Sequence, residues 1–397
     1  MVEYWAAAAL VGAVALSSVA HAQDARRLDF GARATVMHDS NVARSNRTLA
    51  SSRGIEPEDV IFTPSLTLDL LWPVSRQSFF ANGAVGYDFY DKNDKLNSNR
   101  ISLRSGLNGQ IGPCTGVIQG GFSRSRNDLQ DLTLTNPENI RNVTSANLNV
   151  NCSRGYGLGL LVSAGHDWAT NSNAIQAQSD YETSTGRVGV TYARPTFGTL
   201  SVFAMRQRTE YDPTLGGTNP GYDLTVTGLS FERRLGARIQ GTVELSYSTV
   251  DSLASGPNAP DDFSGVTYGG DLVYRPSDRL ETSLSYSRGV VPSNSIGKLY
   301  DVQERVRLGA RYELSSRLEL GGGLSFSDSR AEGPTLGTVP GVVLTDSRTK
   351  VAFASLTYKQ SQRTSLRLDV TREEREADVP AFEYATTRVG LTADVAF

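Results

Sequence analysis

Two short stretches of this sequence place a histidine beside a carboxylate, a pairing that could carry acid–base chemistry. His38 precedes Asp39, and His166 precedes Asp167. A positioned imidazole could transfer protons in a hydrolytic reaction. However, His38 continues the apolar side of an alternating segment that includes Val36, and His166 lies on a similar apolar side. We therefore predict no catalytic residue and no enzyme activity.

Other patterns that carry chemistry are missing from the sequence. No group of Cys, His and carboxylate residues has metal-site spacing, no loop has the phosphate-binding pattern, and no serine lies in a nucleophile elbow. We expect no metal and no cofactor. The net charge of −3 also gives the chain no electrostatic attraction for nucleic acid.

The two cysteines have the spacing of a cross-strand pair. Cys114 follows one short turn, and Cys152 precedes the next, with a long loop at residues 127–140 between them. Both share a side with Ile118 and Leu148, so pairing of the two strands brings them opposite one another. Exported proteins meet an oxidising compartment. We predict a disulfide, with two reduced thiols lying side by side as the alternative.

Charged residues occupy the polar side of the alternating segments. If these segments close into a cylinder, this side faces its lumen, where charges either set selectivity or pair to stiffen the wall; both interpretations stay open. The basic residues are mostly arginine, 34 against 5 lysines (39 − 5 = 34). The predicted lumen residues are Arg33, Asp69, Asp88, Arg104, Glu244, Asp271, Arg275, Glu281, Arg305, Arg307, Arg311, Glu313, Glu319, Arg367, Asp369, Arg388 and Asp394.

The elements that position these residues are predicted to be long β-strands. From Leu28 onward, stretches of about ten to fourteen residues alternate apolar and polar side chains, and the connections alternate between short and long, with the last long loop predicted at residues 373–381. Tilted strands that cross a bilayer need about 9–11 residues, whereas globular strands average about 5–6. We predict an all-β fold: a transmembrane antiparallel up-and-down β-barrel of about eighteen strands. The stretches near residues 200–207 and 351–357 alternate poorly, so one hairpin could be misread or bulged.

Both ends of the chain carry export signals. Residues 5–19 are apolar, and Ala20-His21-Ala22 forms a small-x-small cleavage pattern, which predicts a signal peptide over residues 1–22 and a barrel over residues 23–397. The last residue, Phe397, ends an alternating strand. This ending resembles the signal that the outer-membrane assembly machinery recognises. We expect the protein to lie in the bacterial outer membrane, with outer-membrane lipid and the assembly machinery as its partners.

The chain resembles the outer-membrane β-barrel porins encoded beside bacterial exopolysaccharide and capsule export systems. The resemblance rests on the first strand followed by His38-Asp39-Ser40-Asn41-Val42, on Thr63-Pro64-Ser65-Leu66 at the second strand, and on the Phe397 end. It implies a pore of eighteen strands that passes a secreted polysaccharide outward together with a periplasmic export protein. The family has no catalytic residues.

The predicted function is therefore a non-enzymatic pore for polysaccharide export. One alternative is a general diffusion porin for small hydrophilic solutes, which usually has a loop folded into its lumen; only residues 39–59 are long enough to be a candidate. The other alternative is a structural or adhesive surface barrel whose loops bind glycan without transport.

Overall fold

The computed structural model describes residues 26–126, 139–153, 155–174, 176–212, 221–253, 263–293, 298–332 and 346–397. The predicted signal peptide lies outside these residues. No helix in these described ranges is long and apolar enough to cross a membrane.

Eighteen strands of 13 to 16 residues account for most of the described chain. Their length is that of tilted bilayer crossings. The strands are β1 (Arg27–Asp39), β2 (Asp59–Val74), β3 (Gln77–Tyr90), β4 (Ser98–Ile111), β5 (Cys114–Arg126), β6 (Ile140–Cys152), β7 (Gly157–Asn171), β8 (Tyr181–Arg194), β9 (Gly198–Tyr211), β10 (Gly221–Leu235), β11 (Ile239–Ser252), β12 (Phe263–Ser277), β13 (Leu280–Pro292), β14 (Tyr300–Glu313), β15 (Leu318–Glu332), β16 (Asp346–Lys359), β17 (Thr364–Ala377) and β18 (Tyr384–Ala396). The short helices are α1 (Arg47–Ser52), η1 (Asp94–Leu96), η3 (Gln176–Ser179) and η4 (Pro380–Phe382).

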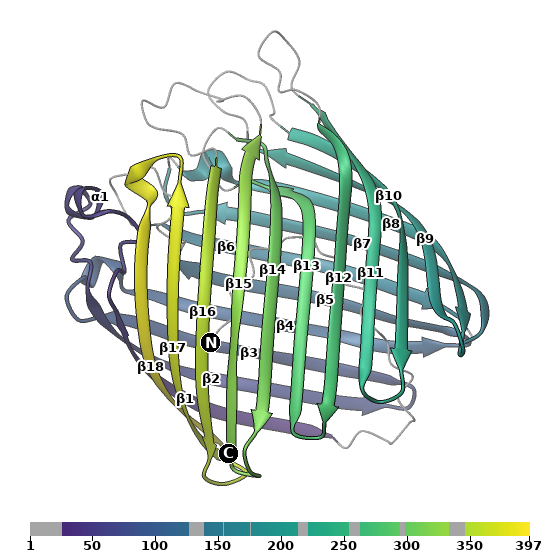
Figure 1. Cartoon of the computed structure of the whole chain (residues 1–397), viewed down its shortest axis with the longest axis horizontal. Helices are drawn as coiled ribbons and strands as arrows, with labels where there is room; N and C mark the ends of the chain where they lie inside the picture. Colours follow the sequence, from purple (N-terminus) through teal and green to yellow (C-terminus); the bar gives the residue numbers. More distant parts are fainter. Residues whose placement is uncertain are drawn as a thin grey trace.

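The strands close into one antiparallel barrel, which confirms the predicted fold class. Each strand pairs with its neighbours in the chain, and β1 pairs with both β2 and β18. The closing seam runs from Gly31↔Ala396 to Asp39↔Arg388. Figure 1 shows β12–β18 crossing in front of β1–β6, with β8–β10 turning between the two walls. Each described strand has a paired neighbour on both sides, so the backbone can be hydrogen-bonded along most of its passage through a bilayer.

Alternation along the strands separates an apolar outer face from a polar inner face. In an antiparallel pair, directly opposed residues share a face. Phe30 opposes Leu68, and both lie on the outer face, where many large apolar side chains are exposed; Leu66, for example, is 68% exposed. This exposed apolar surface encircles the barrel, as contact with hydrocarbon requires.

The short connections between strands need special backbone conformations in a few places. Gly112, in the turn between β4 and β5, has φ +58°, and Gly236, between β10 and β11, has φ +62°. An added Cβ at either position would meet nothing within 4 Å. Backbone conformation, and not lack of space, therefore selects glycine at these turns.

Three details of the strands differ from the sequence-based expectation. The segment at residues 373–381, expected to be a loop, is strand as far as Ala377, because its residues pair with β16 and β18. The poorly alternating β9 and β16 are continuous strands. The register shift instead lies between β12 and β13, at Tyr274/Ser277.

The wall is incomplete at the long-loop end of the β12–β13 seam. These strands pair only from Ser277↔Leu280 up to Tyr268↔Arg288. Beyond that point β12 continues to pair with β11, and β13 continues to pair with β14 up to Pro292. In Figure 1, β13 bends away from β12 at its upper end. The end of the β13–β14 hairpin has therefore left the plane of the wall.

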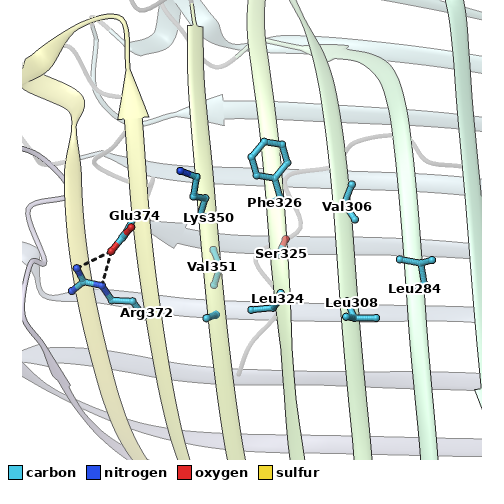
Figure 2. Close-up of a pocket in the computed structure, with 11 residues that line it drawn as sticks. Leu284, Val306, Leu308, Leu324, Ser325, Phe326, Lys350, Val351, Arg372 and Glu374 are labelled. Carbon is cyan, nitrogen blue, oxygen red and sulfur yellow. Dashed lines mark hydrogen bonds and ion pairs between the residues drawn. The ribbon is translucent and has the colours of Figure 1, made fainter.

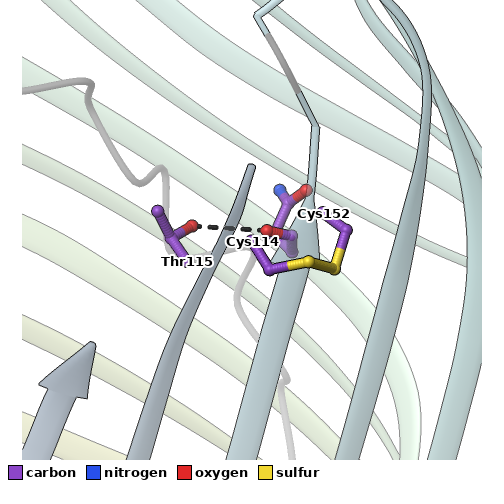
Figure 3. The surroundings of a disulfide bond; sticks show 4 residues. Cys114, Thr115 and Cys152 are labelled. Carbon is purple, nitrogen blue, oxygen red and sulfur yellow. Dashed lines mark hydrogen bonds between the residues drawn. A yellow bond between two sulfur atoms is a disulfide. The ribbon is translucent and has the colours of Figure 1, made fainter. Parts of the chain in front are cut away.

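The two cysteines are joined at the short-turn end of β5 and β6. Cys114 directly opposes Cys152, and their sulfur atoms are bonded at 2.08 Å (Figure 3). Both follow the outer-face parity of Ile118 and Leu148. The bridge links strands whose other ends are joined by the long loop, so it closes this hairpin into a covalent ring.

The alternation gives a direct test of which face contacts lipid. Replacing Leu148, which is on the outer face midway along β6, with Arg should lower the free energy of unfolding in lipid vesicles by about 2–4 kcal/mol. The same change at the neighbouring inner-face residue, Asn149→Arg, should cost less than about 1 kcal/mol. Urea unfolding monitored by tryptophan fluorescence measures both variants. Equal losses would contradict the assignment of faces.

Candidate functional site in the barrel lumen

The inner face gathers the charged residues that the sequence pointed to. The strand pairings place these residues on the inner face, opposite the exposed apolar face. Arg275 is the exception, because it lies at the register shift between β12 and β13. They are Arg33 on β1, Asp69 on β2, Asp88 on β3, Arg104 on β4, Glu244 on β11, Asp271 and Arg275 on β12, Glu281 on β13, Arg305, Arg307, Arg311 and Glu313 on β14, Glu319 on β15, Arg367 and Asp369 on β17, and Arg388 and Asp394 on β18.

Most of these charges form ion pairs along the wall. Four pairs join predicted residues to one another: Arg33–Asp394 at 2.5 Å, Arg275–Glu281 at 2.7 Å, Arg367–Asp369 at 2.8 Å and Arg311–Glu319 at 2.9 Å. Four more use partners that sequence reasoning missed: Arg27–Asp69 and Arg388–Glu373 at 2.6 Å, Arg100–Asp88 at 2.7 Å and Arg187–Glu244 at 2.9 Å. Since paired charges largely cancel, no strong field of one sign dominates the wall.

Arg187 is the most enclosed arginine in these last four pairs. Its side chain is 6% exposed, reaches from β8 to Glu244 on β11, and lies with its guanidinium carbon 3.5 Å from the centroid of the Phe203 ring. The contact crosses the strongly curved side of the barrel (Figure 1). The alternation of Val188, Val190 and Tyr192 on the outer face was the available signal, because it places Arg187 inside.

An amide-rich band crosses one wall of the lumen. Asn82 on β3 directly opposes Arg104 on β4. The Arg104 guanidinium donates to Gln119 Oε1 on β5 through Nε at 3.0 Å and through Nη2 at 2.5 Å. Gln119 in turn directly opposes Asn147 on β6. We call these four residues the amide band. Four neighbouring strands spaced about 4.8 Å apart make it about 14 Å wide. It offers donors and acceptors without a carboxylate among its own members.

The opposite wall carries two arginines between serines. Arg307 on β14 lies between Ser285 on β13 and Ser325 on β15, and Arg305 lies between Ser287 and Ser327 in the same way. β5 and β14 are nine strands apart in a ring of eighteen, so this wall faces the amide band. The short serine side chains leave room around the long arginines and present hydroxyl groups beside them.

The bent end of the β13–β14 hairpin lies against the inner face of β8–β12. The Tyr211 hydroxyl on β9 donates to the carbonyl of Leu299 at 2.5 Å and accepts from the N–H of Ser293 at 3.1 Å. Tyr300 packs with its ring centroid 5.5 Å from that of Tyr222 on β10. The described flanks of this hairpin end, Ser293 and Leu299–Tyr300, therefore lie inside the long-loop mouth against β9 and β10, in addition to the predicted candidate at residues 39–59.

The comparison with known sequences is decisive for the family. Residues 32–397 match the family described as "Putative beta-barrel porin 2". The chain belongs to this porin family. It is thus an outer-membrane β-barrel porin, located in the bacterial outer membrane, with the long loops outside and the short turns in the periplasm. No curated protein matches the sequence.

Solved structures with a similar outline are distant from this porin. OccK2 (OpdF) of Pseudomonas aeruginosa, in complex with glucuronate, is 12% identical with a TM-score of 0.48; the match covers 94% of this chain and 98% of that chain. OpdK of P. aeruginosa, with vanillate, is 10% identical with a TM-score of 0.47 and coverages of 93% and 99%. The FrpB iron transporter of Neisseria meningitidis is 9% identical, with a TM-score of 0.46 and coverages of 88% and 62%. These likenesses carry no argument about substrate.

The first external loop of the porin is ordered by its neighbours. Asp39, at the end of β1, is buried and forms a two-pronged ion pair with Arg44, with an Nη2–Oδ2 distance of 2.7 Å, while the Thr386 hydroxyl donates to the same carboxylate. Val42 and Ile55 of this loop pack with other apolar residues at the mouth. The loop also contains Arg53, whose pKa is lowered by burial to about 10, so it remains a cation at neutral pH.

The two histidines do not form acid–base pairs with the aspartates that follow them. His38 lies on the outer face with Nε2 2.9 Å from Glu58 Oε1, whereas Asp39 binds Arg44 on the inner side. His166 contacts Ser184 on the outer face, and Asp167 follows the opposite parity. Each imidazole and the carboxylate that follows it therefore belong to opposite faces of the wall.

Tyr211 is the residue on which the inward position of the hairpin end can be tested. Tyr211→Phe removes the hydroxyl that contacts Ser293 and Leu299, at about 1 kcal/mol for each neutral hydrogen bond. Hydrogen exchange at the Ser293 amide should become about thirtyfold faster, since the two bonds together contribute about 2 kcal/mol and 1.4 kcal/mol corresponds to a factor of ten. Tyr192→Phe, on the outer face of β8, is the matched control and should leave this rate unchanged. Unaltered exchange in Tyr211→Phe would show that the hydroxyl does not hold the segment.

Proposed function

We propose that this porin passes hydroxyl-rich saccharide chains across the outer membrane and that its cargo is a secreted polysaccharide. The observation that carries the proposal is the amide band facing the serine-flanked arginines. Amides both donate and accept hydrogen bonds, guanidinium groups donate in a planar fork, and serines do both at short reach. Sugar hydroxyls both donate and accept hydrogen bonds, so they can bind all three kinds of group.

The charge distribution supports a substrate recognised by hydrogen bonds instead of by net charge. Ion pairs such as Arg33–Asp394 and Arg367–Asp369 neutralise much of the remaining inner wall. A weakly charged, hydrogen-bonding surface suits a substrate that must slide from site to site, because conduction requires binding weak enough for release. A barrel of sixteen to eighteen strands also encloses an aqueous bore.

Export implies partners at the periplasmic end. A polymer must be delivered to the short-turn side of the barrel, where the Cys114–Cys152 bridge lies. We include a periplasmic polysaccharide export protein in the proposal for this reason, together with the assembly machinery that would recognise Phe397.

A second candidate, diffusion of small hydrophilic solutes, is favoured by the bent end of the β13–β14 hairpin. Tyr211 holds the flanks of this segment, Ser293 and Leu299, against the inner face, and a segment in that position would narrow the mouth as the inward loop of a diffusion porin does. A narrow mouth admits monomeric solutes more readily than a bulky polymer. Conductance and secretion measurements separate these two functions.

Oligosaccharide binding in the lumen tests the amide band. The double variant Gln119→Ala/Asn147→Ala removes two of its four members and should shorten the blockade of single-channel current by a neutral oligosaccharide about tenfold. Asn142→Ala, on the outer parity of the same strand, is the matched control and should keep the parent's blockade times. Planar-bilayer recording measures both. Unchanged blockade in the double variant would remove the amide band as a saccharide surface.

Export itself is tested in cells. Deletion of the coding sequence should abolish release of extracellular polysaccharide, and the parent chain should restore it, whereas the Gln119→Ala/Asn147→Ala variant should restore it only partly. Sugar analysis of the culture medium measures the release. Normal secretion in the deletion strain, together with channels that pass small sugars in bilayers, would favour the diffusion porin instead.

A further inference from the structure

The outer wall of the barrel has a groove on its membrane side, across β13–β17. It has a volume of about 550 Å³ and an almost entirely apolar floor. Figure 2 shows Leu284, Leu308 and Leu324 in a line along it, with Phe326 above them and Lys350, Arg372 and Glu374 at one end. All of these residues lie on outer-face positions.

A small residue explains why the wall is hollow here. Ala352 on β16 lies directly between Leu324 on β15 and Arg372 on β17. Its methyl group leaves space between a leucine on one side and the stem of an arginine on the other. The hollow spans β13 to β17, four interstrand steps and therefore about 19 Å, which is wide enough for several acyl chains side by side.

Three cations border the groove on its β16–β17 side, each held in place by a carboxylate: Arg372 lies in the same row as Leu324, and Lys350 and Arg348 follow towards the long loops on β16. Lys350 Nζ is 2.6 Å from Glu376 Oε1, Arg372 Nη2 is 3.0 Å from Glu374 Oε1, and Arg348 Nη2 is 3.2 Å from Asp328 Oδ2. The side chains of Lys350 and Arg372 are about half exposed. The ammonium group has three donors, and Glu376 engages one, so Lys350 can still donate to an incoming acceptor.

The height of this cluster matches the outer headgroup layer. On β16, the outer-face positions from Tyr358 to Ala352 are apolar or aromatic, and Lys350 comes next. From Tyr358 to Lys350 is eight residues, about 27 Å along a strand and about 20 Å along the membrane normal after tilting. Since the apolar band of such barrels is about 25 Å tall, the Lys350 backbone lies about 5 Å inside its external edge, and the lysine side chain can reach the phosphates of outer-leaflet lipids.

We propose that this groove binds lipid A, the phosphorylated glycolipid of the outer leaflet, with its acyl chains on the leucine floor and a phosphate on Lys350 and Arg372. Lipid A combines several acyl chains with phosphate groups, which matches a wide apolar hollow bordered by lysine and arginine side chains whose ion pairs use only part of their N–H donors. The carboxylates orient the cations and prevent them from folding onto the apolar floor. The site lies outside the lumen and does not rest on the proposed transport function.

Titration of the delipidated full chain with diphosphoryl lipid A, followed by native mass spectrometry, tests the proposal. Lys350→Ala/Arg372→Ala should weaken binding at least tenfold. Ala352→Trp, which fills the hollow and keeps every charge, should weaken it similarly. Arg206→Ala/Arg208→Ala is the matched control: these arginines lie on the outer face of β9, where they pair with Asp223, and their loss should leave binding unchanged.

Several outcomes would overturn the site. Parent-level binding by the Lys350/Arg372 double variant or by Ala352→Trp would do so, as would an equal loss in the Arg206/Arg208 control. Inorganic phosphate that competes fully with lipid A would indicate an anion site without a role for the groove, and phosphatidylglycerol vesicles that bind equally well would indicate non-selective lipid contact. Heat-dependent mobility on gels shows that each variant has folded, and the two groove variants test the site independently if one of them fails to fold.

Discussion

The structure depends on one constraint: within a bilayer, every backbone N–H and C=O must find a partner in the protein. Pairing of β1 with β18 satisfies it by leaving no free edge. Once the sheet is closed, side-chain alternation must separate lipid from water, so the inner face has to carry the polar residues. Among the described strands, pairing of the wall stops early at the upper β12–β13 seam. There, the end of β13 no longer pairs with β12, and the end of the β13–β14 hairpin contacts residues inside the mouth, including Tyr211.

Much of this fold could be predicted from the sequence, because side-chain alternation and connection length are both local. The barrel type and strand number follow from them directly. The predictions were least secure where inner positions are apolar. Phe203 on β9 and Phe353 on β16 lie on the inner face, so these strands alternate poorly although they are regular. The inward bend of β13 was not predicted, since it depends on contacts with Tyr211 and Tyr222, which are far away in sequence.

For the site, side-chain alternation predicted which charged residues face the lumen, but not which residues they pair with. Arg187 meets Glu244 only because barrel curvature brings β8 near β11, and no local pattern encodes that distance. The sequence predicts a loop at Glu373 because its stretch, Arg-Glu-Glu-Arg-Glu, is charged on both parities. In the structure, Glu373 lies in β17 and forms an ion pair with Arg388 on the inner wall. The amide band likewise needs the register of four strands at once.

The covalent bond between β5 and β6 bears on the register of this hairpin. Cys114 and Cys152 can join only when they stand directly opposite each other, and slippage by a single residue would turn Ile118 and Leu148 from lipid towards water. In the folded barrel, the bridge fixes this alignment covalently, because β5 cannot slide along β6 while the two sulfur atoms are bonded. The disulfide therefore holds the register at the short-turn end of a hairpin whose other end is joined only through a long connection.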